Sequence, residues 1–418
     1  MLHRKFALPD DEPNALPLRD TGPIGFDEAF RRVAAMAKPV GTEKVALWDA
    51  DDRVLVAPAI AQRSAPLVAV SAMDGYAVRD ADLGASPIRL KIVGRSFAGA
   101  GFSGAINSGE CVRIFTGAPL PAGADRVVVQ EDVVLDGSVA LFALPPSNRW
   151  HVRAAGADFN YGDILVPAGR KLKPQHLVAA AAADLDELEV FRRPRVHILC
   201  CGDELARPGE AWRSADKIPE SISVGVAALV RRWGGVVNGY DLLPDDVLLL
   251  ESAARKALQS SELVVVIGGA SVGEKDFAKT AFACLGMRQV FSKVAIKPGK
   301  PVWLGEVRGT PVLGLPGNPT SALVTARLFL APLIFGMAGN DPAKALNWRA
   351  TPFEGAFERC RDRDIFFRAE VGEGCATALK SQDSADQKAL ADADVLVRVR
   401  PNKQGIAPKG TTVETVEF

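Results

Sequence analysis

The chain has 418 residues, of which 48% are hydrophobic and 24% are charged, and its 50 basic residues balance 50 acidic ones. This length predicts two to four domains of about 150 residues each, and the zero net charge excludes a long-range field that would draw the chain onto nucleic acid or an anionic membrane. We therefore expect neither as a partner, and an anionic ligand must be held by a local site.

The cysteines and the apolar stretches indicate the compartment. No two cysteines form a CxxC pair and no histidine lies at ligand spacing from them, so we expect buried thiols in a reducing compartment and no structural zinc. The pair Cys200–Cys201 ends an apolar run, which favours core packing over a redox role. The first twenty residues are polar, and the apolar stretch 328–338 is interrupted by Pro332 and is too short to span a bilayer. We expect a cytoplasmic protein.

The first part of the chain shows two patterns of apolar and polar residues. Residues 26–37 carry apolar side chains at helical spacing, which predicts an amphipathic helix. Residues 88–144 change to short β-type runs separated by Gly and Pro, which predict a small all-β module.

From residue 195 to 336 the sequence pattern is typical of an α/β domain. Three continuous apolar runs, VHILCC, ELVVVIGG and PVLGLPG, alternate with helical segments around 221–233, 246–258 and 320–335. Continuous apolar strands predict a parallel sheet that is covered on both faces. After Pro352 the pattern returns to β. The predicted fold class is multidomain α/β plus β.

The loop after ELVVVI carries the strongest ligand signal. Ligands bind at the carboxyl ends of parallel strands, and here Gly268 and Gly269 let a ligand approach backbone N–H groups, while Ser271 adds a hydroxyl for phosphate oxygens. Asp276 closes the loop, and its carboxylate would repel a bare phosphate. A divalent cation such as Mg²⁺ between them removes this conflict. The alternative is a glycine turn followed by solvated charges.

Two further loops follow strands of the same sheet. Asp203 and Glu204 come directly after VHILCC, where they can serve a metal or simply cap a turn. After PVLGL, Asn318 is a good N-cap and Pro319 suits the first helical position, so a helix N-terminus that favours anions is expected there. The alternative is a helix start without a ligand.

The segment before this loop forms a local basic spot. It contains Lys293, Lys297 and Lys300, the last two in a rigid Pro/Gly frame. Such a spot can hold an oxyanion or phosphate in a neutral protein. The loops 71–77 and 116–125 would be interpreted as structural on composition alone.

Together these segments resemble the molybdopterin molybdenumtransferase family (MoeA and the E domain of gephyrin). The resemblance rests on SAMDGYAVRDAD, TGAPLPAGADRVVVQED, GDEL, GGASVGEKDF, VAIKPGKPVWLG and GLPGNPTSALVT, which occur in the family's order across residues 71–325. It implies Mg²⁺-dependent insertion of molybdate into adenylated molybdopterin with release of AMP. It also implies an elongated homodimer with active sites shared between chains, and a molybdopterin adenylyltransferase or a molybdoenzyme as partner.

The resemblance also implies a domain plan. We expect a split N-terminal dimerisation segment at residues 1–62 and 150–190, an inserted β module at 63–149, an α/β molybdopterin-binding domain at 191–338 and a C-terminal β-barrel at 339–418.

The resemblance also implies site residues, each assigned to the position of this sequence that matches the family motif. The catalytic positions implied are Asp74, Thr116, Asp158, Glu204, Asp276, Lys293 and Lys297. The substrate-binding positions implied are Gly268, Gly269, Ser271, Gly273, Lys300, Pro316, Gly317, Asn318, Pro319 and Ser321. Asp276, Glu204 and one acid of the Asp245–Asp246 pair, taken as Asp245, are the implied metal ligands.

The chain departs from the family pattern in four places. Cys201 stands where a Thr is usual, Ala270 replaces a Val, Ile222 stands where an Asn that touches the ligand is expected, and residues 382–386 are more polar than usual. Ile222 motivates an alternative, a carrier paralogue that binds molybdopterin without inserting metal. A third alternative is a relative that adenylylates molybdopterin or hydrolyses pyridine nucleotides, but such proteins lack the SAMDGYA module.

Overall fold

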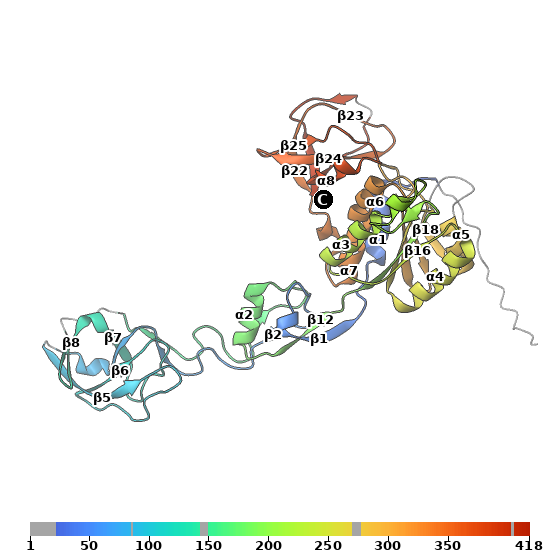
Figure 1. Cartoon of the computed structure of the whole chain (residues 1–418). Helices are drawn as coiled ribbons and strands as arrows, with labels where there is room; N and C mark the ends of the chain where they lie inside the picture. Colours follow the sequence, from blue (N-terminus) through green and yellow to red (C-terminus); the bar gives the residue numbers. More distant parts are fainter. Residues whose placement is uncertain (1–21, 85–86, 143–148, 270–276, 403–404) are drawn as a thin grey trace, which may run out of the picture. The chain divides into compact units, whose positions relative to one another are not determined.

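The computed structural model describes residues 22–84, 87–142, 149–269, 277–402 and 405–418 (Figure 1). The chain divides into two compact units. One unit is Lys44–Val190, and the other combines the chain up to Glu43 with Phe191–Phe418. The predicted class, α/β plus β, is confirmed.

The larger unit is built on a six-stranded sheet in the order β16-β13-β17-β21-β20-β18. These strands are β13 (Arg195–Cys201), β16 (Val236–Leu243), β17 (Leu263–Ile267), β18 (Arg288–Phe291), β20 (Trp303–Val307) and β21 (Thr310–Leu315). Neighbours from β16 to β21 pair in parallel, as the three apolar runs predict, whereas β20 and β18 are antiparallel. The antiparallel step arises because Arg308 and Gly309, both at positive φ, form a two-residue hairpin turn.

Helices cover both faces of this sheet. They are α1 (Phe26–Met36), α3 (Ile222–Arg232), α4 (Val247–Ser260), α5 (Phe277–Cys284), α6 (Pro319–Thr325), the π-helix η5 (Ala326–Leu330) and α7 (Ala331–Met337). Successive residues of a strand point to opposite faces. Accordingly Ile198 and Cys200 join the core under α1, α3 and α7, while Leu199 and Cys201 join the core under α4 and α5. The predicted helices near residues 26, 221, 246 and 320 are confirmed.

The vicinal cysteines are buried free thiols, as the core-packing interpretation predicts. Burial raises the pKa of the Cys201 thiol to about 12 and that of Cys200 further, so both thiols stay protonated at neutral pH.

The expectation that Pro332 interrupts the apolar stretch was wrong. α6, η5 and α7 form one continuous helix, and Pro332 is accommodated inside it directly after the π-helical turn η5, where the regular i→i−4 hydrogen-bond pattern is already interrupted. This helix, Pro319–Met337, is the one candidate membrane span among the described residues, and 89% of its apolar window is buried, as in the core helix of a globular domain.

The predicted C-terminal barrel is confirmed. β22 (Arg349–Glu354), β24 (Asp364–Gly372), β25 (Cys375–Ala378), β26 (Val395–Val399) and β28 (Thr412–Glu417) close into a ring through the β24–β26 pairing. β19 (Ile296–Lys297) extends this sheet, and β23 (Phe357–Glu358) pairs with β27 (Ile406–Ala407). The helix α8 (Gln387–Ala391), which no apolar periodicity predicted, follows β25.

The smaller unit carries its own six-stranded sheet, in the order β7-β4-β6-β5-β9-β8 (Figure 1). Its strands are β4 (Gly75–Val78), β5 (Ile88–Ser96), β6 (Glu110–Ile114), β7 (Arg126–Val129), β8 (Val133–Asp136) and β9 (Val139–Phe142), so the predicted β module is confirmed and begins earlier than residue 88. The rest of the unit holds α2 (Pro174–Ala182) and three short pairs. These are β2 (Ala59–Ile60) with β11 (Ile164–Val166), β3 (Val70–Ser71) with β10 (Val152–Arg153), and β1 (Thr42–Ala46) with β12 (Glu187–Phe191).

A buried arginine attaches α1 to the barrel. Arg398 of β26 is 4% exposed; its Nε lies 2.7 Å from Asp364 Oδ1, and its Nη2 lies 2.9 Å from Asp27 Oδ1. Its guanidinium carbon lies 4.4 Å from the centroid of the Phe26 ring. Burial raises the pKa of Asp364 above its usual value despite this pairing.

Replacing Arg398 with Leu is expected to lower the free energy of unfolding by about 3–5 kcal/mol, because it leaves the Asp364 carboxylate buried without its cation. Arg400 is the matched control: it also pairs with Asp27 but is 54% exposed. Arg400→Ala should cost at most about 1 kcal/mol. Chemical denaturation of both variants measures the difference, and equal losses would contradict a special role for the buried pair.

Candidate functional site

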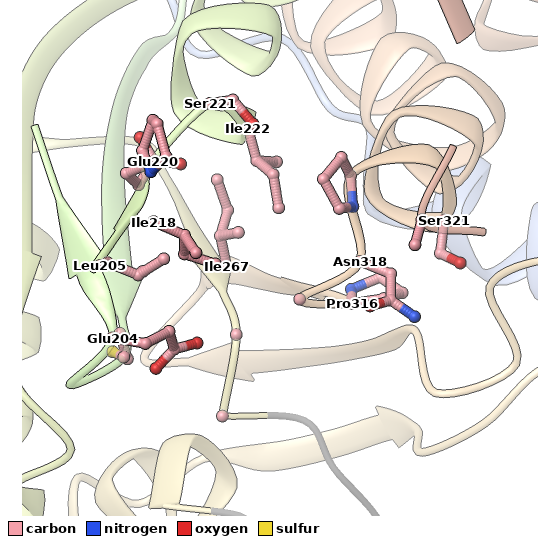
Figure 2. Close-up of a pocket in the computed structure, with 18 of the residues that line it drawn as sticks. Glu204, Leu205, Ile218, Glu220, Ser221, Ile222, Ile267, Pro316, Asn318 and Ser321 are labelled. Atoms are coloured by element: carbon pink, nitrogen blue, oxygen red, sulfur yellow. The ribbon is translucent and has the colours of Figure 1, made fainter. Parts of the chain in front are cut away.

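The three loops that the sequence singles out line one cavity. It has a volume of about 750 Å³ and lies at the carboxyl ends of β13, β17 and β21 (Figure 2). Nine of the predicted site residues line it: Glu204, Asp245, Gly268, Gly269, Pro316, Gly317, Asn318, Pro319 and Ser321. Ser271, Gly273 and Asp276 lie outside the described residues.

The acids near the cavity divide into lining and structural residues. Glu204 and Asp245 line the cavity. Asp203 instead accepts a hydrogen bond from the Asp245 backbone N–H at 3.1 Å, and Asp246 caps α4 by accepting from the N–H groups of Leu248 and Leu249. Of the Asp245–Asp246 pair, Asp245 is therefore the one that faces the cavity, because Asp246 is committed to its helix.

Two of the lining carboxylates, those of Glu204 and Asp245, meet the minimum for a magnesium ion. Mg²⁺ is usually held by one or two carboxylates together with substrate phosphates and water. Among the described residues no group of three or more His, Cys, Asp or Glu side chains is arranged to hold a metal.

The side formed by the start of α6 includes the loop around Ser384, which stands out in the sequence for its polar composition but is not among the predicted site residues. Asn318 occupies the predicted N-cap position, but its side chain donates to Ser384 Oγ at 3.2 Å rather than capping the helix. The backbone N–H of Thr320 donates to the Ser384 carbonyl at 3.3 Å, and Ala385 and Gln387 of the same loop line the cavity.

This loop is held in place by a buried arginine of the barrel sheet. Arg368 of β24 has no exposed surface, and its Nη2 donates to the carbonyls of Asp383 at 3.0 Å and Ser381 at 3.2 Å. Its Nη1 donates to Thr320 Oγ1 at 3.2 Å. Arg368 thus joins the barrel, the loop and the start of α6, and the polar segment 382–386 forms part of the cavity wall.

The opposite side of the cavity combines apolar side chains with acids. Figure 2 shows Leu205, Ile218, Ile222 and Ile267 on one side and Asn318 and Ser321 on the other. Ile222 is the first residue of α3 and is 7% exposed. The position of the expected Asn is therefore in the wall, and the side chain there offers contact area instead of a hydrogen bond.

Glu220 is an acid of the cavity wall that sequence reasoning passed over. It is 2% exposed and accepts hydrogen bonds from the backbone N–H of Ser223 at 2.9 Å, from the Ser223 hydroxyl and from the Tyr240 hydroxyl at 3.3 Å. Burial is the main cause that raises the pKa of Tyr240 to about 12, so this hydroxyl remains a donor at neutral pH. The only feature of the sequence that could have indicated Glu220 is its position two residues before the start of α3.

The smaller unit brings two further predicted residues together. Both the backbone N–H and the hydroxyl of Thr116 donate to Asp74 Oδ1, each at 2.7 Å. These hydrogen bonds lower the pKa of Asp74, the backbone bond most, so the carboxylate is ionised at neutral pH. Asp158 lies exposed on the returning segment, where its backbone N–H donates to the Ala65 carbonyl at 3.0 Å.

Comparison with known proteins places this chain in a family. A family model described as the MoeA N-terminal region (domain I and II) matches residues 24–183, and a probable molybdopterin binding domain matches residues 197–336. A molybdopterin molybdenumtransferase of Haemophilus influenzae is 37% identical over 316 residues, which are 75% of this chain and 76% of the relative. The chain belongs to the molybdopterin molybdenumtransferase family.

The family match extends over nearly the whole chain. A molybdopterin molybdenumtransferase of Synechococcus elongatus is 32% identical over 386 residues, which are 90% of this chain and 94% of the relative. Two solved molybdopterin biosynthesis MoeA structures from Pyrococcus horikoshii, 27% and 24% identical, have TM-scores of 0.82 and 0.79; each covers 95% of this chain, which spans 99% and 100% of theirs. The family likeness therefore includes the C-terminal barrel, which lies beyond both family models.

Not all residues implied by the family resemblance lie at the cavity. Lys293 is half-buried, and Lys297 and Lys300 are exposed; none of the three lines the 750 Å³ cavity. Lys297 lines a second cavity of about 580 Å³ with Pro298 and residues of the barrel. The separation arises because β19 pairs with β24 of the barrel, which buries Ile296 and turns Lys297 outward.

Proposed function

We propose that this chain inserts molybdenum, supplied as molybdate, into adenylated molybdopterin and releases AMP in a Mg²⁺-dependent reaction. The observation that carries the proposal is the single cavity in which Glu204 and Asp245 meet glycine loops and the start of α6. The family membership, with relatives named molybdopterin molybdenumtransferase, supports the same reaction.

The residues of this chain act mainly by positioning. The backbone N–H groups of Gly268 and Thr320 already donate to the carbonyls of Leu315 and Ser384, so those of Gly269 and Ser321 would bind the phosphates. Glu204 and Asp245 of the cavity, with Asp276 of the glycine loop, would hold Mg²⁺. When bound, Mg²⁺ supplies positive charge between these carboxylates and the phosphates. The apolar wall at Ile222 and Ile267 excludes water from one side of the ligand. Because the chemistry is ligand exchange at molybdenum with loss of the nucleotide, alignment and charge neutralisation outweigh proton transfer.

A homodimer with shared active sites is part of the proposal. The smaller unit exposes large apolar side chains on elements that pack together: Trp48 is 96% exposed, Val178 and Tyr161 are each 71% exposed and Ile164 is 61% exposed. Exposed apolar patches mark interaction surfaces. We propose that this surface is the dimer contact and that Asp74, Thr116 and Asp158 of one chain serve the active site of its partner. The domain limits at residues 62, 149, 190 and 338 belong to the same proposal.

The second candidate function is a carrier that binds molybdopterin without inserting metal. Ile222 favours it, because an apolar side chain there removes a hydrogen-bond partner from the cavity. Incubation with adenylated molybdopterin, molybdate and Mg²⁺, followed by chromatography of AMP, separates the two. The enzyme releases AMP only when all three are present, whereas a carrier binds the pterin and releases none.

The adjacent acids Asp245 and Asp246 allow a paired prediction. Asp246→Ala should lower the free energy of unfolding by about 1 kcal/mol through loss of the α4 cap and leave AMP release intact. Asp245→Ala should lower AMP release far more than it lowers the free energy of unfolding. Thermal unfolding and AMP release measured on both variants test this division, and the reverse pattern would remove Asp245 from the site.

A further inference from the structure

Three loops of the smaller unit meet at one end of its sheet. β5 runs parallel to β6 and β4 runs antiparallel to it, so Ser96 at the end of β5, Ile114 at the end of β6 and Gly75 at the start of β4 are in register. The residues that continue from these positions, Phe97, Phe115 and Asp74, therefore emerge at the same end.

Two of these residues form a stacked aromatic pair. The rings of Phe97 and Phe115 lie 4.6 Å apart between centroids and are parallel to within 9°. Arg113 adds a cation: its guanidinium carbon lies 5.1 Å from the centroid of Phe115 and 4.9 Å from that of the buried Tyr76. Phe97 is 42% exposed even though it belongs to this ordered cluster. A flat ring that is fixed by stacking and open to solvent is a platform for another planar ring.

A hydrogen-bond acceptor lies in the next loop. Thr116 follows Phe115 directly, and both of its hydrogen bonds to Asp74 end on Oδ1. Within the part of the chain that the structure describes, no donor is placed on Asp74 Oδ2. An ionised carboxylate only accepts hydrogen bonds, so this oxygen favours ligand groups that donate an N–H or O–H. Arg113 steadies the loop by donating to the Gly75 carbonyl at 3.4 Å and to Gln130 Oε1.

We propose that this end of the β module binds an aminated nitrogen heterocycle, which stacks on Phe97 and donates an N–H group to Asp74. The inference rests on the proposed function, because the adenylated substrate carries two rings of this chemistry, the pterin and the adenine. It assigns Phe97 and Phe115, which neither the motifs nor the family resemblance singled out, as residues that select the substrate.

Equilibrium dialysis of the full-length chain with AMP and, separately, with 6-hydroxymethylpterin tests the inference. Phe97→Leu keeps an apolar contact with Phe115 but removes the flat ring, and it should raise the Kd of one of the two ligands about tenfold, which corresponds to about 1.4 kcal/mol. Phe97→Tyr should retain the wild-type Kd, and Asp74→Asn should weaken the same ligand. The affected ligand identifies which ring occupies the site.

The control is Leu135→Ala, which removes a 59% exposed apolar side chain from β8 of the same module and should change neither Kd. Absence of binding of both ligands to the wild type, or equal Kd values for the wild type and Phe97→Leu, overturns the inference. AMP release by the wild type, assayed in parallel, keeps the two proposals apart. If the wild type releases AMP but its ligand binding does not depend on Phe97, only the inference about Phe97 is wrong. If the wild type releases no AMP but its ligand binding does depend on Phe97, only the proposed transfer reaction is wrong.

Discussion

Replacing Glu204 with Gln is expected to lower the rate of AMP release by about a hundredfold or more, because the substitution removes one negative charge that holds Mg²⁺ against the substrate phosphates. Glu204 is exposed in the cavity, so the thermal unfolding temperature should not change. The rate of AMP release at saturating Mg²⁺, molybdate and substrate is the measurement. Asp276→Ala should show the same loss, since its carboxylate follows the glycine loop directly.

Glu210→Gln is the control for Glu204→Gln. It makes the same change of charge at an exposed acid in the segment that follows β14 (Leu205–Ala206) and precedes β15 (Ile218–Pro219), and it should retain full activity. Wild-type AMP release by a folded Glu204→Gln protein would show that Glu204 has no part in holding the metal.

Mixing two inactive variants is expected to restore activity. If each site combines the β module of one chain with the α/β domain of its partner, a heterodimer of Asp74→Ala and Glu204→Ala chains has one intact site and one doubly damaged site. Random reassociation of equal amounts then gives half heterodimers, so roughly a quarter of the wild-type activity should return. Unfolding, mixing and refolding, followed by the AMP assay, measures the recovery.

The control for this experiment pairs two variants of the same module, Asp74→Ala and Thr116→Ala. Every site in that mixture contains one damaged module, so no activity should return. If the Asp74→Ala and Glu204→Ala mixture also stays inactive although heterodimers are demonstrated, the sites lie within single chains and the shared-site proposal is wrong.

The parts of the cavity that were predictable depend on local patterns. Continuous apolar runs identify β13, β17 and β21, and glycines or an N-cap after each run place Glu204, Gly268 and Asn318 at one edge of a parallel sheet. Parallel strands end at the same edge of a sheet, so this part of the cavity can be predicted without knowledge of contacts between distant segments.

The parts that were not predictable depend on contacts between distant segments. Ser384 lies 66 residues from Asn318, and Arg368, which positions its loop, belongs to the barrel. The position of Lys297 likewise follows from its pairing with β24, which no local pattern reveals. Glu220 could have been found from its place before α3, but its burial and its contact with Tyr240 required the tertiary structure.

Transfer of molybdenum coupled to loss of the nucleotide can be followed in a single-turnover experiment. Adenylated molybdopterin is incubated with excess wild-type chain, molybdate and Mg²⁺, and both AMP and pterin-bound molybdenum are quantified after a single turnover. We expect equal amounts of the two products, and neither product when molybdate is omitted. AMP release without pterin-bound molybdenum, or substrate binding without either product, would contradict it.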